Sequence, residues 1–167
     1  YGPRLYGYFL RAARSHHEAE DLLGELMLRL VRRLKSYDER GRFDQWLFRI
    51  AANLVRDRIR RLQAAPETLS LSEQRHEQRR RLGEDVPART PPVEARMEAE
   101  EQSRRLARAL EELDETTRQM ILLRHYGQMS FKELAEVFDC PLGTALARVH
   151  RGLRAMRQWM DHGDGLE

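Results

Sequence analysis

The feature that most constrains the fold is the stretch from residue 130 to residue 154, which has the pattern of two short helices joined by a tight turn. Ser130 and Glu133 stand at the spacing of a capping box, in which the two side chains satisfy free amides at a helix start. Pro141 then follows, and proline suits the first turn of a second helix because it has no N–H to leave unbonded. The stretch therefore predicts a helix-turn-helix.

The second helix of this pair is predicted to have one buried face and one basic face. At about 100° per residue, the apolar positions fall together: Leu142, Ala145, Val149, Leu153 and Met156. The other side of the helix and its flanks carry the residues expected to reach DNA: Leu146, Ala147, Arg148, His150, Arg151 and Arg154. A short basic face is what a helix needs to enter the major groove, so we expect DNA binding. Two amphipathic helices joined by a turn also occur in helical proteins that do not touch DNA.

The composition limits the other functions open to this chain. Its formal net charge is only +3 over 167 residues, so nucleic-acid contacts must come from local basic clusters. Cys140 is the only cysteine, which excludes an internal disulfide and a cysteine-based zinc site and is typical of the reducing cytoplasm. No run approaches the ~20 apolar residues of a membrane span, and no signal peptide is visible, so we expect a cytoplasmic protein without direct membrane insertion.

The sequence also gives little reason to expect catalysis. It contains no glycine-rich loop that would cradle a nucleotide and no HExxH motif. His16, His17 and Glu20 place too few ligands on one helix face to make a good metal site. We therefore expect no enzymatic activity, no metal and no other cofactor.

Hydrophobic periodicity predicts an all-α chain of two small helical modules joined by a flexible linker. Residues 1–63 have the pattern of three helices, at about 3–14, 15–35 and 43–62, and the second begins at another capping box, Ser15 with Glu18. Residues 64–96 are rich in proline and charge, as linkers are. Residues 97–160 add helices at about 98–112 and 114–126 before the helix-turn-helix. The buried stripe of the second helix is predicted to hold Leu23, Leu26, Met27, Leu30, Val31 and Leu34.

The two modules together resemble bacterial sigma-70 family RNA polymerase sigma factors of the extracytoplasmic-function group. Region 2 of that family is similar to the segments AEDLLGELMLRL and FDQWLFRIAANLVRDRIRR, and region 4 is similar to LDETTRQMILLRHYGQMSFKELAEVFDCPLGTALARVHRGLRAM. The resemblance covers nearly the whole chain outside the linker. It implies an alternative sigma factor that binds core RNA polymerase and directs promoter-specific transcription initiation.

The resemblance also implies a surface for the polymerase. In this family the helix that carries AEDLLGE docks on the clamp coiled coil of the largest polymerase subunit. The matching residues lie opposite the predicted buried stripe: Asp21, Gly24, Glu25 and Leu28. The family commonly has glutamine where this chain has Gly24, and glycine inside a helix costs ~1 kcal/mol relative to alanine. Core binding is therefore expected to differ from the family pattern at this position.

The third helix is the one that the family uses to melt and read the minus-ten element. Its polar stripe and the loop before it supply the matching residues: Tyr37, Arg42, Arg49, Asn53, Arg56 and Arg60. Arginine neutralises phosphate, asparagine can pair with a base edge, and an aromatic ring can stack on an unpaired base. Phe43 and Trp46 are expected in the core rather than stacked on bases.

In the second module the resemblance implies minus-35 recognition of duplex DNA by Leu146, Ala147, His150 and Arg151, with Arg148 on phosphate. The implied partners are core RNA polymerase, promoter DNA and an anti-sigma factor that is either membrane-anchored or soluble. Two alternatives stay open at this point. One is a sigma-like decoy that sequesters an anti-sigma factor, and the other is a free-standing helix-turn-helix regulator.

Overall fold

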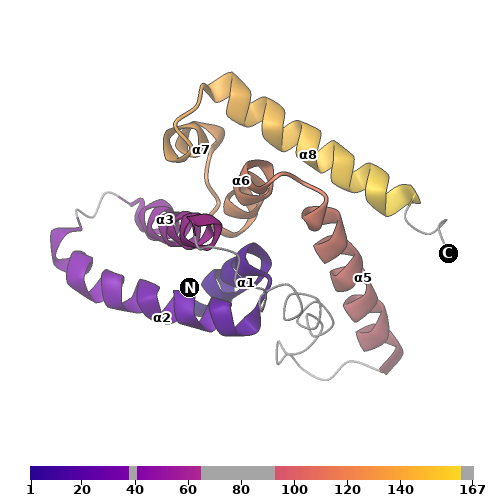
Figure 1. The fold of residues 1–167 in the computed structure, drawn as a ribbon, viewed down its shortest axis with the longest axis horizontal. Coiled ribbons are helices and arrows are strands. Elements are labelled where there is room, and N and C mark those ends of the chain that lie inside the picture. The colour runs from indigo at the N-terminus through magenta and orange to yellow at the C-terminus, as the bar shows by residue number, and fades with distance from the viewer. Residues whose placement is uncertain (38–40, 65–92, 163–167) are drawn as a thin grey trace.

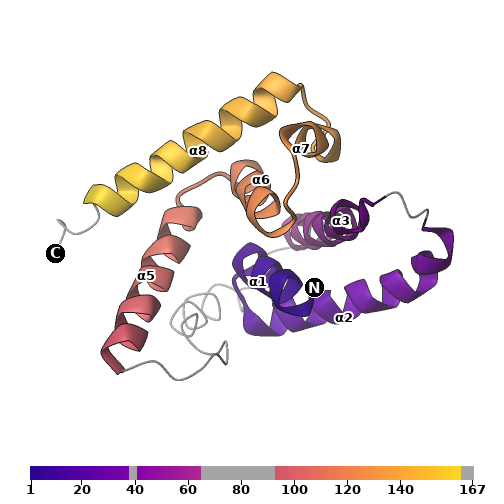
Figure 2. The ribbon, with the colours of Figure 1, turned by 180° about the vertical axis from the view of Figure 1, so that it is seen from behind.

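The computed structural model describes residues 1–37, 41–64 and 93–162, and the regular structure in those ranges is helical throughout (Figures 1 and 2). This confirms the predicted all-α fold. The greater part of the predicted linker, residues 65–92, lies outside the described residues. The helices are α1 (Gly2–Ala13), α2 (His16–Arg33), the 3-10 turn η1 (Leu34–Ser36), α3 (Phe43–Ala64), α5 (Val93–Glu111), α6 (Glu115–Tyr126), α7 (Phe131–Val137) and α8 (Leu142–His162).

Side-chain caps fix the starts of several helices. At α7 the Ser130 hydroxyl accepts from the Glu133 amide at 3.2 Å, and the Glu133 carboxylate accepts from the Ser130 amide at 2.7 Å. This is the complete capping box that the sequence predicts. At α2 the Ser15 hydroxyl accepts from the Glu18 amide, but the Glu18 carboxylate binds Arg58 of α3 at 2.9 Å. The second cap is therefore half of the predicted box, because Glu18 holds a neighbouring helix instead.

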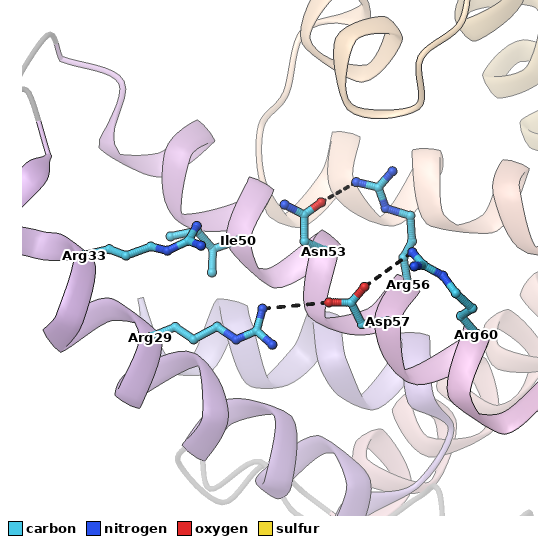
Figure 3. A pocket seen from close by; sticks show the side chains of 7 residues that line it. All are labelled: Arg29, Arg33, Ile50, Asn53, Arg56, Asp57 and Arg60. Atoms are coloured by element: carbon cyan, nitrogen blue, oxygen red, sulfur yellow. Dashed lines mark hydrogen bonds and ion pairs between the residues drawn. The ribbon is translucent and has the colours of Figure 1, made fainter.

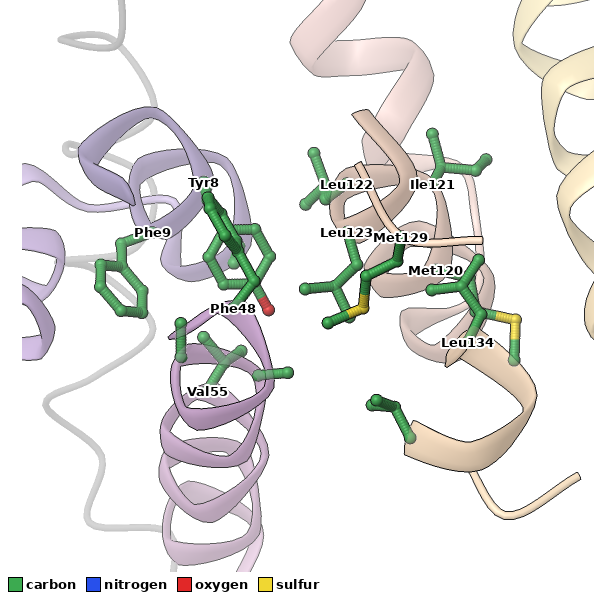
Figure 4. Close-up of a cluster of buried hydrophobic side chains, with 14 of the residues drawn as sticks. Tyr8, Phe9, Phe48, Val55, Met120, Ile121, Leu122, Leu123, Met129 and Leu134 are labelled. Carbon is green, nitrogen blue, oxygen red and sulfur yellow. The ribbon is translucent and has the colours of Figure 1, made fainter. Parts of the chain in front are cut away.

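Helix α6 lies at the centre of the molecule. It contacts α1 and α3 on one side and α8 on the other, with α7 beside it (Figures 1 and 2). The buried side chains of all these helices form one continuous cluster. In Figure 4, Tyr8 and Phe48 of the first module face Leu123 and Met129 of the second. The two helical modules thus share one hydrophobic core, a direct packing that the sequence did not predict.

The predicted buried stripe of α2 is wrong in part. Leu26 is buried together with Ala19 and Leu22, but Val31 is 73% exposed, and Met27 and Leu34 are exposed as well. The apolar arc of this helix is wider than the surface that its neighbours α1 and α3 cover. The uncovered part of the arc faces solvent.

The predicted buried stripe of α8 needs a similar correction. Ala145, Val149 and Met156 are buried as expected, but Leu142 and Leu153 are about half exposed, at 51% and 47%. The helix instead approaches α6 most closely at Gly152, where an added Cβ would lie 2.5 Å from the Thr117 methyl carbon. The buried line therefore runs one residue to the side of Leu153.

No helix among those described combines the length and the apolar character that crossing a bilayer requires.

Candidate nucleic-acid interface

A cleft of about 370 Å³ opens between α2 and α3 (Figure 3). Four arginines line it, two from each helix, together with Ile50, Asn53 and Asp57 of α3. Asp57 is the only acidic residue among these lining side chains, and its carboxylate lies 3.9 Å from Arg29 and 3.4 Å from Arg60. The cleft is therefore strongly cationic and also contains the side-chain amide of Asn53. Its arginines suit the phosphate backbone of a nucleic acid, and the amide suits a base edge.

Three of the residues predicted for minus-ten DNA line this cleft: Asn53, Arg56 and Arg60. The other three do not reach it. Arg49 is exposed on α3 one turn earlier, Arg42 is exposed at the start of that helix, and Tyr37 packs beside Trp46, with ring centroids 4.7 Å apart. The structure thus brings one half of the predicted set together in the cleft and leaves the other half outside it.

Two residues that the sequence analysis did not single out complete the cleft. Arg29 and Arg33 lie one helical turn apart on α2 and face α3. Their spacing puts them on one helix face, but the pairing of α2 with α3 was needed to identify that face as part of the site. The run LRLVRR at the end of the helix was the available signal.

Arg56 is held by the second module. Its guanidinium donates to the carbonyl of Val137 at 2.7 Å and to the side-chain oxygen of Asn53, and it lies 5.4 Å from the ring centre of Phe138. Arg49 is held in the same way, because it lies 2.9 Å from the Glu136 carboxylate. Two arginines of the polar face of α3, Arg49 and Arg56, are therefore already bound by residues of α7.

An aromatic group stands at the start of α3. Phe43 packs against Tyr37, Trp46 and Tyr1, with ring centroids 5.3 Å, 5.6 Å and 5.4 Å away. Phe43 and Trp46 are half-buried and pack against the core, so they occupy the boundary between core and surface.

The second basic surface is the outer face of α8. Five of its predicted DNA-contacting residues are exposed: Leu146, Ala147, His150, Arg151 and Arg154. The sixth, Arg148, is half-buried and lies 3.2 Å from Asp114 at the start of α6. His150 stacks on Phe131 of α7 with centroids 5.9 Å apart. The first helix of the pair therefore supports the face of the second, an arrangement that suits major-groove docking.

The predicted polymerase-binding residues lie on the outer side of α2. Asp21, Gly24 and Leu28 are exposed, and an added Cβ at Gly24 would meet nothing within 4 Å. Glu25 differs from the prediction, because it is half-buried and binds Arg29 at 2.6 Å. Exposed apolar side chains continue this side toward the end of the helix. We call them the α2 apolar stripe: Met27, Leu28, Val31 and Leu34.

Within the described ranges, no group of three potential metal ligands comes together. His16, one of the residues considered from the sequence, instead has its Nδ1 2.8 Å from the Tyr6 hydroxyl.

Comparison with known proteins places this arrangement in a family. The family profile for sigma-70 region 2 matches residues 1–65, and that for sigma-70 region 4 matches residues 103–156. The RNA polymerase sigma factor CarQ of Myxococcus xanthus is 31% identical, over 95% of this chain and 83% of its own length. The ECF RNA polymerase sigma factor SigW of Bacillus subtilis is 29% identical with the same coverage.

The chain belongs to the sigma-70 family of RNA polymerase sigma factors, and within it to the extracytoplasmic-function group. The fold is also similar to a solved structure of the sigma factor RpoE in complex with the anti-sigma factor NepR from Bartonella quintana. That similarity has a TM-score of 0.65 at 19% sequence identity and covers 95% of this chain and 91% of the other.

Proposed function

We propose that this chain is an alternative sigma factor that binds core RNA polymerase and directs it to a specific set of promoters. The observation that carries the proposal is the presence of two separate cationic surfaces, the α2–α3 cleft and the outer face of α8, in a chain of this family. In this role the chain performs no chemistry itself. It acts in the cytoplasm, where core polymerase works.

The division of labour between the modules is part of this proposal. Residues 1–63 bind core polymerase through Asp21, Gly24, Glu25 and Leu28 of α2 and engage the melted minus-ten strand through α3. Residues 97–160 engage the minus-35 duplex through α8, and residues 64–96 connect the two. The exposure of Leu28, at 63%, supports an apolar contact with the polymerase.

The electrostatics support single-stranded DNA as the occupant of the α2–α3 cleft. Guanidinium groups from both walls can neutralise successive phosphates, while Asn53 offers a donor and an acceptor to a base edge. Tyr37, which precedes α3, offers an aromatic surface on which an unstacked base can rest, worth ~1–3 kcal/mol per base. Such contacts offset part of the cost of opening a duplex.

An anti-sigma factor is the further partner that we propose. The structure of similar fold is described as a sigma factor in complex with an anti-sigma factor. The α2 apolar stripe is a surface that such a partner, whether membrane-anchored or soluble, would cover to exclude the polymerase.

Run-off transcription tests the proposal. Core polymerase with and without this chain is presented with a library of upstream bacterial DNA fragments, and the start sites are sequenced. We expect core polymerase alone to be silent and the mixture to initiate at a defined set of sites that share two elements. A folded chain that binds core polymerase but never initiates would favour the decoy alternative. A chain that binds duplex DNA and ignores core polymerase would favour the free-standing regulator.

A further inference from the structure

The imidazole of His150 on α8 is held by residues that belong to two other helices. It stacks on the Phe131 ring of α7, with ring centroids 5.9 Å apart and an angle of 26° between the ring planes. The guanidinium of Arg124 on α6 lies over the same Phe131 ring, 5.1 Å from its centre. We call these three side chains the Phe131 stack. It joins α6, α7 and α8 at one point of the outer face of α8.

The supports of the imidazole are themselves fixed in place. Phe131 is the first residue of α7, directly after Ser130, whose capping box with Glu133 sets the helix start. Its ring is half-buried and packs against the core cluster. Arg124 is anchored as well, because its guanidinium donates to the carbonyl of Met129 at 2.6 Å, and Met129 is fully buried. Both supports are therefore in position before any DNA binds.

His150 remains exposed although it rests on this stack. It lies one turn after Leu146 and directly before Arg151, on the outer face of α8. An exposed histidine without such a contact samples several rotamers and loses that freedom when it binds a partner. Aromatic pairs favour an offset arrangement with centroids about 4.5–7 Å apart, and the His150 ring lies within that range of Phe131. The stack therefore restricts the imidazole beforehand.

The chemistry of imidazole makes this restriction useful for reading a base pair. A neutral imidazole offers one N–H donor and one ring nitrogen that accepts. Each base pair presents its own pattern of donors and acceptors in the major groove. A freely turning ring can match several patterns, whereas a ring held in one orientation directs its donor and acceptor to fixed points. A held ring is thus a more selective reader than a free one.

We propose that Phe131, supported by Arg124, is a positioning residue for sequence recognition: it holds the His150 ring so that His150 selects one base pair of the duplex. Phe131 acts through the imidazole and needs no contact with DNA of its own. The inference deepens the proposed function, since it rests on α8 as the surface that reads duplex DNA. It does not depend on transcription initiation.

The first measurement checks the stack in the full chain by proton nuclear magnetic resonance. The ring current of Phe131 should shift the ring protons of His150 upfield, and His150→Ala identifies these signals by their absence. We expect Phe131→Leu to abolish the upfield shift and Phe131→Tyr, which keeps an aromatic ring, to retain it. Ordinary shifts for the His150 ring protons in the unmodified chain would overturn the stack.

The second measurement determines base preference by selection from duplexes that carry a randomised segment. The selection uses the full chain with core polymerase and the full chain alone, so a chain that ignores the polymerase still reports its preference. We expect His150→Ala to lose the preference at one base pair, and Phe131→Leu to reduce the preference at that same base pair by about two- to tenfold. Phe131→Tyr should retain it.

A double variant separates positioning from general damage to the fold. In a His150→Ala background, Phe131→Leu should cause no further change of preference at this base pair, because its effect passes through the imidazole. If Phe131→Leu instead weakens binding to all duplexes by one common factor and leaves every base preference unchanged, the positioning role is wrong. Selection without any base preference in the unmodified chain would contradict it too.

Arg124 gives a second route if Phe131→Leu does not fold. Arg124→Met removes the exposed guanidinium over the ring and should relax the preference at the same base pair as His150→Ala. Arg157→Met removes the same charge farther along α8 and is the matched control, with no base pair relaxed. Equal preferences for these two variants would refute the supporting role. Because selection measures binding, a silent transcription assay would refute the sigma role and leave this result standing.

Discussion

The guanidinium of Arg148 on α8 lies 3.2 Å from the carboxylate of Asp114, the residue that caps the N-terminus of α6. The same carboxylate accepts from the Thr117 amide at 3.0 Å and from the Thr117 hydroxyl at 2.6 Å. One acidic side chain therefore starts the central helix and also holds a residue of the proposed DNA-reading face.

Replacement of Asp114 by alanine should weaken the fold while leaving the basic face in place. Loss of an N-cap side chain costs about 0.5–2 kcal/mol in the free energy of unfolding. Chemical denaturation measures this cost, and Glu112→Ala, at an exposed position just before the cap, is the control. Duplex DNA binding should not fall, because Arg148 is released for phosphate. An unchanged denaturation midpoint for Asp114→Ala would contradict the assigned cap.

The charge on Asp114 should make part of the stability depend on pH. Burial alone would raise the pKa of this carboxyl, but hydrogen bonds from Thr117 and the charge of Arg148 outweigh burial and hold the pKa below its ordinary value. A carboxyl with a lowered folded-state pKa contributes stability above its ordinary pKa, and that contribution is lost as the pH falls through the folded value.

The variant Asp114→Asn isolates this effect, since asparagine also caps helices well. We expect the unmodified chain to be more stable than this variant at neutral pH, and the difference to shrink as the pH falls below the ordinary pKa of aspartate, about 3.9. Denaturation curves at a series of pH values measure it. A difference that is the same at every pH would count against the ionic role.

Gly152 should be the most demanding position of α8. An added Cβ there would lie 2.5 Å from Thr117 and 2.8 Å from Ile121, both on α6. We expect Gly152→Ala to lower the free energy of unfolding by about 1–3 kcal/mol through overpacking. Gly143→Ala on the same helix, where nothing lies within 4 Å, should instead raise it by about 0.5 kcal/mol. Thermal unfolding of the two variants measures both changes in stability. Equal changes for Gly152→Ala and Gly143→Ala would contradict the close approach of α8 to α6 at Gly152.

A charge in the α2 apolar stripe should separate polymerase binding from folding. Val31 is exposed, so Val31→Asp is expected to change the free energy of unfolding by no more than about 0.5 kcal/mol. Its affinity for core polymerase should fall by at least about fivefold if the stripe is central to that interface. Gln102→Asp adds the same charge at an exposed position on α5 and serves as the control. Fluorescence titration with core polymerase gives both affinities.

Arg151 should contribute directly to duplex recognition. Once the transcription assay has identified a minus-35 element, Arg151→Ala is expected to weaken binding to that duplex by about 1–3 kcal/mol. Arg157→Ala removes the same charge farther along α8, from an arginine 3.7 Å from Asp161, and should have the smaller effect. Fluorescence anisotropy compares the two. Equal losses would indicate general charge attraction rather than base contact.

Local patterns in the sequence predict the helices well because their causes are local. Ser130 and Glu133 cap each other across a few residues, so the capping box can be identified without knowledge of the fold. Likewise, the exposed basic face of α8 follows from helical periodicity alone.

Which helix faces are covered depends on partners that periodicity does not reveal. Val31 and Leu153 have apolar side chains on apolar arcs, yet they are exposed, because the neighbouring helices pack slightly to one side. Arg29 and Arg33 line the cleft because α2 packs beside α3, and the sequence alone does not reveal that pairing. The core shared by the two modules could not be predicted for the same reason: it depends on contacts between distant parts of the chain, such as that between Tyr8 and Gln119, which are 111 positions apart.

That separation has a consequence for how the protein is made. Helices α1 and α3 leave the ribosome first, but the Tyr8 and Phe48 side of their core is covered only when α6 and Met129 follow. At ~5–20 residues per second, the interval between residues 64 and 129 is roughly 3–13 seconds. During this interval the nascent chain exposes an apolar surface that its own later half must cover. A chaperone that binds exposed apolar surface would therefore act mainly in this interval.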